Sequence, residues 1–138
     1  MSIVYMMNNQ SERSEIYNRA KSFQYAFEGW WHVLRTQHNA WIHAVVSIAV
    51  FAVGFWLGIS ALEWAVLVLT IMAVWMAEFM NTAIEAVVDM TMPEIHPLAK
   101  VAKDVAAAAV LLGAIGAVIV GLLILGPPLW EKISGMIG

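Results

Sequence analysis

Four polar side chains fall at helical spacing inside an otherwise apolar stretch: Glu78, Asn81, Glu85 and Asp89. Their positions at i, i+3, i+7 and i+11 place them along one stripe of a helix. A charged side chain within a membrane costs about 3 kcal/mol even on the mildest insertion scale, so a stripe of this kind on a membrane helix indicates a functional site. The alternative is a set of plain ion pairs that neutralise one another.

A second polar cluster, Lys100, Lys103 and Asp104, comes after residues 91–98, which hold two prolines and are expected to form a loop. A short connection makes the flanking helices antiparallel neighbours, so we expect the cluster to face the stripe. Carboxylate and amide oxygens suit Mg²⁺, a lysine at a helix N-terminus suits phosphate oxygens, and a spare carboxylate can take a proton from a hydroxyl. The combination favours phosphoryl transfer to a lipid alcohol.

The same spacing also fits a proton relay or an ion-coupled transport subunit. Against that alternative, the chain has three expected spans, no inverted repeat and no helix broken at the midplane. The sequence also lacks a P-loop and the motifs of protein kinases, so any nucleotide site is of another kind.

The composition excludes several classes of protein. Of the 138 residues 62% are hydrophobic and only 12% charged, which is far too apolar for a soluble domain. The chain has no cysteine, so disulfides, thiolate metal sites and cysteine nucleophiles are excluded. The few basic residues form no nucleic-acid patch. The four histidines are spread over the chain and form no metal set; interfacial hydrogen bonding is the expected role of His32, His38, His43 and His96.

The predicted architecture is an all-α membrane protein with an N-terminal amphipathic surface helix and three transmembrane helices. The leader is polar and aperiodic, without the pattern of a signal peptide, and is expected to be disordered. Aromatic residues at helical spacing predict a helix in the membrane interface, with a soluble partner-binding helix as the alternative. The expected segments are the leader 1–14, a single membrane-embedded domain 15–130 made of the surface helix 15–36 and spans at about 40–60, 62–90 and 100–126, and a short tail 131–138 after Gly126-Pro127-Pro128 ends the last helix.

The basic residues predict the orientation. They precede the first span or come after the second, and only Lys132 opposes this arrangement. Positive residues prefer the cytoplasmic side. The N-terminus and the polar stripe are therefore expected on the cytoplasmic face of the cell membrane, within reach of ATP. The residues used are Arg13, Arg19, Lys21, Arg35, Lys100 and Lys103.

Two strings resemble the bacterial diacylglycerol kinase family: EFMNTAIEAVVD at 78–89 and HPLAKVAKD at 96–104. The resemblance covers roughly residues 20–125, and the segments 96–97 and 57–64 look more like the undecaprenol kinase branch. It implies a small homotrimeric membrane kinase that uses ATP and Mg²⁺ and completes each site with a neighbouring protomer. The implied reaction is phosphorylation of undecaprenol. Phosphorylation of diacylglycerol is the first alternative, and a catalytically silent membrane assembly or transport subunit is an alternative of another class.

The resemblance also implies roles for single residues. Glu78 resembles the general base, with Asn81 beside it in the catalytic centre. The implied metal ligands are Glu85, Gln37 and Glu28, and the implied cofactor-binding residues are Lys103, Asp104, Glu85, Asp89, Lys21 and Tyr25.

One position departs from the family pattern. Gln37 stands where the family usually has a glutamate that binds the metal, and Trp41 stands where a basic residue is often found. A glutamine offers a carbonyl oxygen but no charge, so we expect weaker Mg²⁺ binding. Glu28 is the acidic residue that we expect to compensate.

Overall fold

The computed structural model describes residues 19, 21–91 and 96–137. These residues are almost entirely helical and fall into two units, Met1–Thr36 and Gln37–Gly138, each of which is described by itself. The leader expected at 1–14 lies outside the described residues.

The described part of the first unit is a helix over residues 21–36. Its large aromatic side chains, among them Phe23, Phe27 and Trp31, are exposed, and Arg35 lies 5.2 Å from the centre of the Trp31 ring. The side-chain amide of Gln24 donates a hydrogen bond to Glu28 at 2.8 Å. A helix is therefore present where one was expected, while its position in the membrane interface stays a prediction.

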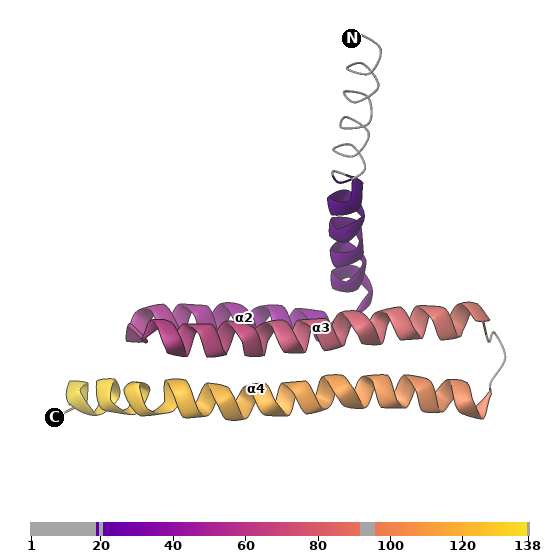
Figure 1. Cartoon of the computed structure of the whole chain (residues 1–138). Helices are drawn as coiled ribbons and strands as arrows, with labels where there is room; N and C mark the ends of the chain where they lie inside the picture. Colours follow the sequence, from indigo (N-terminus) through magenta and orange to yellow (C-terminus); the bar gives the residue numbers. More distant parts are fainter. Residues whose placement is uncertain (1–18, 20, 92–95, 138) are drawn as a thin grey trace, which may run out of the picture. The chain divides into compact units, whose positions relative to one another are not determined.

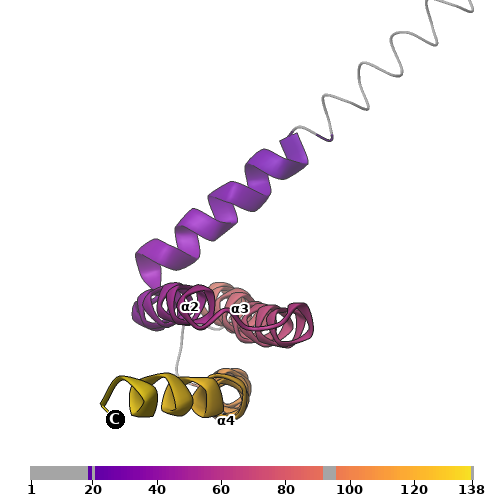
Figure 2. The ribbon, with the colours of Figure 1, turned by 90° about the vertical axis from the view of Figure 1, so that its left-hand side faces the viewer.

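The second unit consists of three long helices: α2 (His38–Leu57), α3 (Ala61–Thr91) and α4 (Pro97–Ile137). Each is long and apolar enough to cross a membrane. α3 and α4 run antiparallel along each other, and α2 packs beside both (Figures 1 and 2). At 1.5 Å per residue, the 31 residues of α3 extend about 46 Å. That exceeds the hydrocarbon thickness of about 30 Å, so one end of α3 leaves the apolar region.

The tight connection between α2 and α3 has a clear local cause. Gly58 adopts the left-handed conformation with φ +69°, and its N–H donates to the carbonyl oxygen of Gly54 at 3.0 Å, which ends α2. Ser60 then begins α3 as a capping box. Glu63 Oε2 accepts hydrogen bonds from the Ser60 backbone N–H at 2.7 Å and from the Ser60 hydroxyl at 2.6 Å.

The expected end of the last helix at Gly126-Pro127-Pro128 is wrong, because α4 continues to Ile137. Each interior proline has a φ angle compatible with a helix, but it removes one backbone donor and its ring crowds the carbonyl four residues back, so the helix continues at a local cost. A tertiary contact holds the segment beyond them. Lys132 Nζ donates to the carbonyl oxygen of Trp56 at 2.6 Å and lies 4.7 Å from the centre of its ring.

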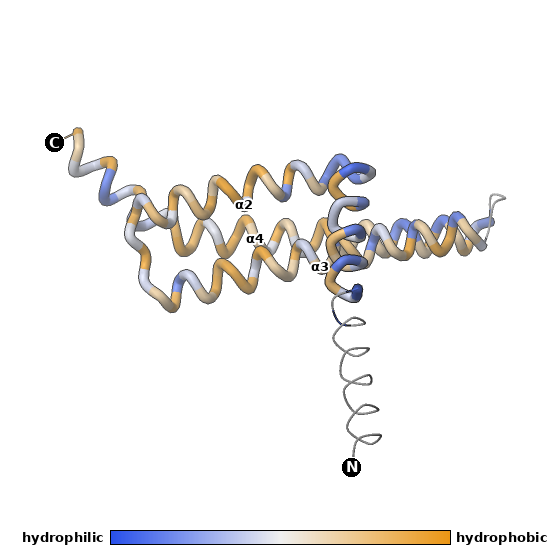
Figure 3. The backbone as a smooth tube through the Cα atoms, turned by 90° about the horizontal axis from the view of Figure 1, so that it is seen from above, coloured by the Kyte–Doolittle hydropathy of each residue, from blue (hydrophilic) through white to orange (hydrophobic). Residues whose placement is uncertain are grey.

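The burial pattern of the second unit is that of a thin bundle with apolar outer faces. Most large apolar side chains of α2, α3 and α4 are exposed. The hydropathy colouring of Figure 3 shows hydrophobic residues along most of the three helices. Hydrophilic residues gather toward the ends of α3 and α4 that flank 92–95 (Figure 3). Among the described residues the largest fully buried side chain is a carboxylate, that of Glu78. The interior of the bundle therefore combines apolar side chains with one buried carboxylate.

Candidate active site

A polar cavity of about 280 Å³ lies between α2, α3 and α4. It contains four of the residues that the sequence predicts for the site, Gln37, Glu78, Asn81 and Glu85. The other residues that line it are Asn39, Ile42, His43, Ala107, Val110, Leu111 and Ala114. The stripe of α3 thus faces its neighbouring helices.

Glu85 is held by two amides. Gln37 Nε2 donates a hydrogen bond to Glu85 Oε2 at 3.0 Å, and Asn81 Nδ2 donates to Glu85 Oε1 at 3.1 Å. With its amide nitrogen bonded to Glu85, Asn81 leaves its carbonyl oxygen Oδ1 buried and without a hydrogen-bond partner. These contacts gather three oxygen-bearing side chains at one place in the cavity.

Glu78 is 1% exposed, and neither of its carboxylate oxygens has a hydrogen-bond partner. Buried polar atoms in folded proteins are nearly always hydrogen-bonded, because leaving one unpaired costs several kcal/mol. The nearest basic nitrogen is Nε2 of His43, 3.7 Å from Glu78 Oε2, and this nitrogen is also buried without a hydrogen-bond partner. The arrangement leaves a buried carboxylate and a buried imidazole nitrogen without hydrogen-bond partners at the cavity.

His43 and Asn39 line the site, although the sequence did not predict them there. His43 was expected to form hydrogen bonds in the membrane interface, and this is wrong, because its side chain lies beside Glu78. A signal was present: Asn39, His43 and Ser47 stand at i, i+4 and i+8 on α2, the same stripe pattern that marks α3. The stripe becomes visible only when the polar residues of α2 are taken together.

The second polar cluster meets the stripe outside this cavity. Lys103 and Asp89 form an ion pair between α4 and α3, and Lys100 pairs with Asp104 within α4. The pair of Lys103 with Asp89 confirms that the cluster faces the stripe. These contacts are ion pairs that neutralise one another, which the sequence left open as the alternative to a functional site. Asp89 comes one helical turn after Glu85, so the pair between helices lies about one turn nearer to 92–95 than the cavity.

The remaining predicted residues, Lys21, Tyr25 and Glu28, lie on the helix of the first unit. Their roles as nucleotide or metal ligands stay predictions.

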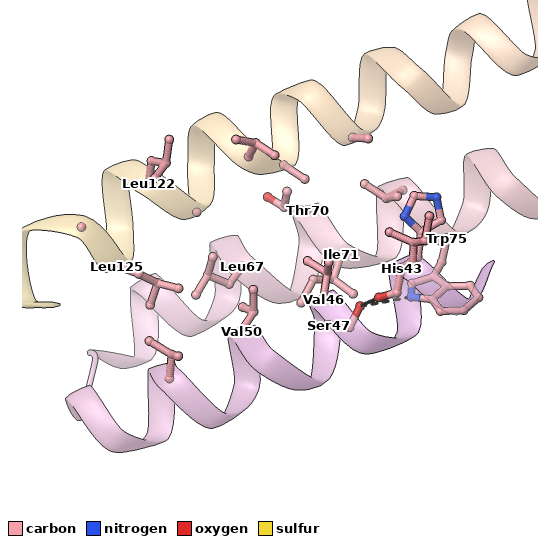
Figure 4. Close-up of a pocket in the computed structure, with 18 of the residues that line it drawn as sticks. His43, Val46, Ser47, Val50, Leu67, Thr70, Ile71, Trp75, Leu122 and Leu125 are labelled. Carbon is pink, nitrogen blue, oxygen red and sulfur yellow. Dashed lines mark hydrogen bonds between the residues drawn. The ribbon is translucent and has the colours of Figure 1, made fainter. Parts of the chain in front are cut away.

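An apolar cavity of about 510 Å³ adjoins the polar one, and the two share Ile42, His43 and Ala114. Figure 4 shows its aliphatic lining along α2, α3 and α4, with His43, Ser47 and Trp75 at one end. Trp75 Nε1 donates to the Ser47 hydroxyl at 3.4 Å, whereas Nε2 of His43 at the same end has no hydrogen-bond partner. An apolar cavity that adjoins a second cavity with a buried carboxylate fits an amphiphile with a hydrocarbon chain and one polar end.

The donor set of the polar cavity fits Mg²⁺ in its chemistry. The carboxylates of Glu78 and Glu85 and the amide oxygens of Asn81 and Gln37 are hard oxygen ligands, and Asn81 Oδ1 lacks a partner. Within the described part of the chain no group of three or more His, Cys, Asp or Glu could hold a metal ion. Mg²⁺ commonly binds through one or two carboxylates together with waters and substrate phosphates, so these residues suit a cation that arrives with a nucleotide.

Known proteins resemble this chain over most of its length. The profile of the prokaryotic diacylglycerol kinase family matches residues 24–125. The undecaprenol kinase of Bacillus subtilis is 42% identical over 123 residues, which cover 89% of this chain and 100% of that protein. The diacylglycerol kinase of Synechocystis is 48% identical over 113 residues, 81% of this chain and 65% of that protein. The diacylglycerol kinase of Escherichia coli K12 is 38% identical over 96 residues, 64% of this chain and 76% of that protein.

The family consists of lipid kinases that use ATP as the phosphoryl donor, which agrees with three membrane-length helices around a buried carboxylate. The chain is a member of the prokaryotic diacylglycerol kinase family and a membrane-embedded lipid kinase.

Proposed function

We propose that this lipid kinase transfers the γ-phosphate of ATP to the hydroxyl of undecaprenol. The observation that carries the proposal is the apolar cavity whose lining includes His43, the residue that lies 3.7 Å from the buried, unpaired carboxylate of Glu78 in the adjoining cavity. The full-length match to a relative named undecaprenol kinase supports the choice of an isoprenoid alcohol. A long chain without polar groups suits a cavity whose lining is almost entirely aliphatic.

Glu78 is the proposed general base. Its carboxylate accepts the proton of the lipid hydroxyl while the hydroxyl oxygen forms a bond to the γ-phosphorus and the bond from that phosphorus to the leaving ADP oxygen breaks. The buried position suits this step, because no hydrogen-bond donor of the protein occupies the two carboxylate oxygens and both are free to accept the proton. The surrounding helices also exclude water as a competing acceptor.

Glu85 and Gln37, with Glu28 from the first unit, are the proposed ligands of Mg²⁺. When bound there, Mg²⁺ would offset the negative charge of the phosphate oxygens. Asn81 has the supporting role of holding Glu85 in place through its hydrogen bond at 3.1 Å. The amides of Gln37 and Asn81 fix the carboxylate of Glu85. The geometry of this ligand is therefore set before the substrates bind.

The nucleotide is proposed to bind at the end of α3 and α4, over the cytoplasmic edge of the cavity. Lys103 would exchange its partner Asp89 for phosphate oxygens, and Asp104 would bind the sugar. Lys21 and Tyr25 on the helix of the first unit would complete the nucleotide site. The polar cavity has no lysine or arginine in its described lining, which favours a homotrimer in which basic groups reach the site from elsewhere.

Diacylglycerol is the second candidate acceptor. The Synechocystis relative, at 48% identity, is named a diacylglycerol kinase, and diacylglycerol also presents a primary hydroxyl beside hydrocarbon chains. The two acceptors differ in the part of the molecule attached to the hydroxyl: undecaprenol carries a single unsaturated chain there, and diacylglycerol carries two ester groups. The hydroxyl and indole donors in the lining of the apolar cavity, those of Ser47, Thr70 and Trp75, already donate to acceptors within the chain, so the isoprenoid alcohol is the better match.

The test is phosphoryl transfer by the purified full chain in mixed micelles, with radiolabelled ATP and one lipid at a time. We expect label in undecaprenol at a higher kcat/KM than in diacylglycerol. A higher value for diacylglycerol would overturn the choice of acceptor. Label in neither lipid would favour the catalytically silent assembly.

A further inference from the structure

His43 and Glu78 lie close enough together for one oxygen atom beside them to hydrogen-bond both side chains. His43 Nε2 and Glu78 Oε2 are 3.7 Å apart, which is beyond hydrogen-bond length, and both are buried without a hydrogen-bond partner. An oxygen atom at about 2.8 Å from each of the two atoms can hydrogen-bond both. A hydroxyl at this position can donate to the carboxylate and accept from the imidazole N–H.

We propose that His43 binds the acceptor hydroxyl together with Glu78. The hydroxyl donates its proton toward Glu78 Oε2 and accepts a hydrogen bond from the Nε2–H of His43. This inference deepens the proposed function, on which it rests, by assigning a second contact to the alcohol.

The chemistry of the cavity points to a neutral hydroxyl and excludes an anion at this place. Both oxygens of Glu78 and Oδ1 of Asn81 are buried acceptors without partners, and an anion beside three acceptors would be repelled. A group that carries a proton satisfies one of these acceptors at once. His43 is the residue beside Glu78 that can supply the complementary donor.

His43 also stands where a lipid would change from hydrocarbon to polar. It lines both the apolar and the polar cavity, and its side chain is 14% exposed. Its backbone carbonyl oxygen accepts a hydrogen bond from the Ser47 hydroxyl at 2.7 Å, and its ring meets Trp75 edge to face with 6.2 Å between centres. The imidazole therefore packs against Trp75 of α3 at the end of the apolar cavity (Figure 4).

The hydrogen bond from His43 has a defined effect on the reaction. It fixes the hydroxyl so that its proton points to Glu78 and a lone pair is free for the γ-phosphorus. The proton passes to Glu78, the new oxygen–phosphorus bond forms as the bond to ADP breaks, and His43 keeps its own proton. Loss of this contact should weaken alcohol binding and leave nucleotide binding intact.

Kinetics of four proteins test the role: wild type, His43→Leu, His43→Gln and His38→Leu. In His43→Leu we expect kcat/KM for undecaprenol to fall by about tenfold or more, the scale of one lost hydrogen bond, with an unchanged KM for MgATP. His43→Gln, whose amide can donate, should recover part of the loss. His38→Leu is the matched control, because His38 is exposed and outside both cavities. Wild-type kcat/KM in a folded His43→Leu protein, or an equal rise in KM for MgATP, would overturn the proposal.

A binding measurement on the wild-type protein separates this inference from the proposed function. The imidazole nitrogens of ¹⁵N-histidine protein are followed in micelles on addition of a C15 isoprenoid alcohol or the matching hydrocarbon without the hydroxyl, and His43→Gln assigns the resonance. We expect only the alcohol to move the His43 signal. Equal shifts with both compounds, or none with either, would overturn the inference. A shift with the alcohol but no phosphoryl transfer would instead refute the proposed function and leave the hydroxyl site standing.

Discussion

Gln37 and Glu85 join α2 to α3 through one hydrogen bond, 3.0 Å from Gln37 Nε2 to Glu85 Oε2. Gln37 is also the residue before the first turn of α2, where a side chain often caps the helix, yet its side chain makes no capping bond. The amide is committed to the carboxylate across the cavity. The site therefore holds Glu85 with a neutral donor at the position where the family resemblance leads us to expect an acid.

Gln37→Glu should remove this hydrogen bond and make the stability of the protein depend on a bound cation. Two carboxylates would then face each other, and their repulsion in a partly buried site destabilises the fold unless a cation lies between them. We expect the Tm of Gln37→Glu in micelles to fall in EDTA and to recover with MgCl₂, and the Mg²⁺ concentration for half-maximal activity to drop below the wild-type value.

Glu131→Gln provides the control for an altered charge, since Glu131 lies on the exposed last part of α4. Its Tm should respond to MgCl₂ as the wild type does. An equal Tm of Gln37→Glu in EDTA and in MgCl₂ would show that position 37 does not share a cation with Glu85.

Lys103→Ala should affect nucleotide binding more than stability. The ion pair of Lys103 with Asp89 is partly exposed, with 36% and 66% of the side chains accessible, and exposed ion pairs contribute about 0–1 kcal/mol. We expect a KM for MgATP raised by about tenfold, the worth of one charge-assisted contact to phosphate, and a Tm within a few degrees of the wild type. Lys132→Ala, at the opposite end of α4, is the comparison. An unchanged KM for MgATP in Lys103→Ala would remove this lysine from the nucleotide site.

Gly54→Ala should destabilise the protein through the packing of α2 on α3. A Cβ atom at Gly54 would lie 2.8 Å from Cη2 of Trp64, and that ring cannot swing away easily because it stacks on Phe51 with 5.5 Å between centres. Overpacking of this kind costs about 1–3 kcal/mol, so we expect a clearly lower Tm. Gly116→Ala is the matched control, since nothing lies within 4 Å of its Cβ position and alanine favours the helix. Equal Tm values for the two variants would contradict the close contact.

The sequence predicted the stripe on α3 well, because helical periodicity alone determines which residues share a face. It also predicted three membrane-length helices from apolar length. Two features escaped it for physical reasons. The extension of α4 past Pro127 and Pro128 comes with the contact of Lys132 with Trp56, which is tertiary and leaves no local pattern.

The partnership of His43 and Glu78 escaped for a related reason. The two residues are far apart in the sequence, and only the packing of α2 against α3 brings their side chains to 3.7 Å. Likewise, the departure at Gln37 was visible in the sequence, but the direct bond of its amide to Glu85 was not. Periodicity assigns faces to helices, whereas the pairing of those faces is a property of the folded chain.

Replacement of Glu78 by glutamine tests the central claim most directly. A buried carboxylate without hydrogen-bond partners contributes nothing to stability that a neutral amide would lose, so the Tm of Glu78→Gln should not fall. If Glu78 takes the proton of the lipid hydroxyl, kcat should drop by about 10²-fold or more, the contribution typical of a general base, while MgATP binds as before. Full activity of Glu78→Gln in mixed micelles, with the Glu131→Gln protein as reference, would contradict the account.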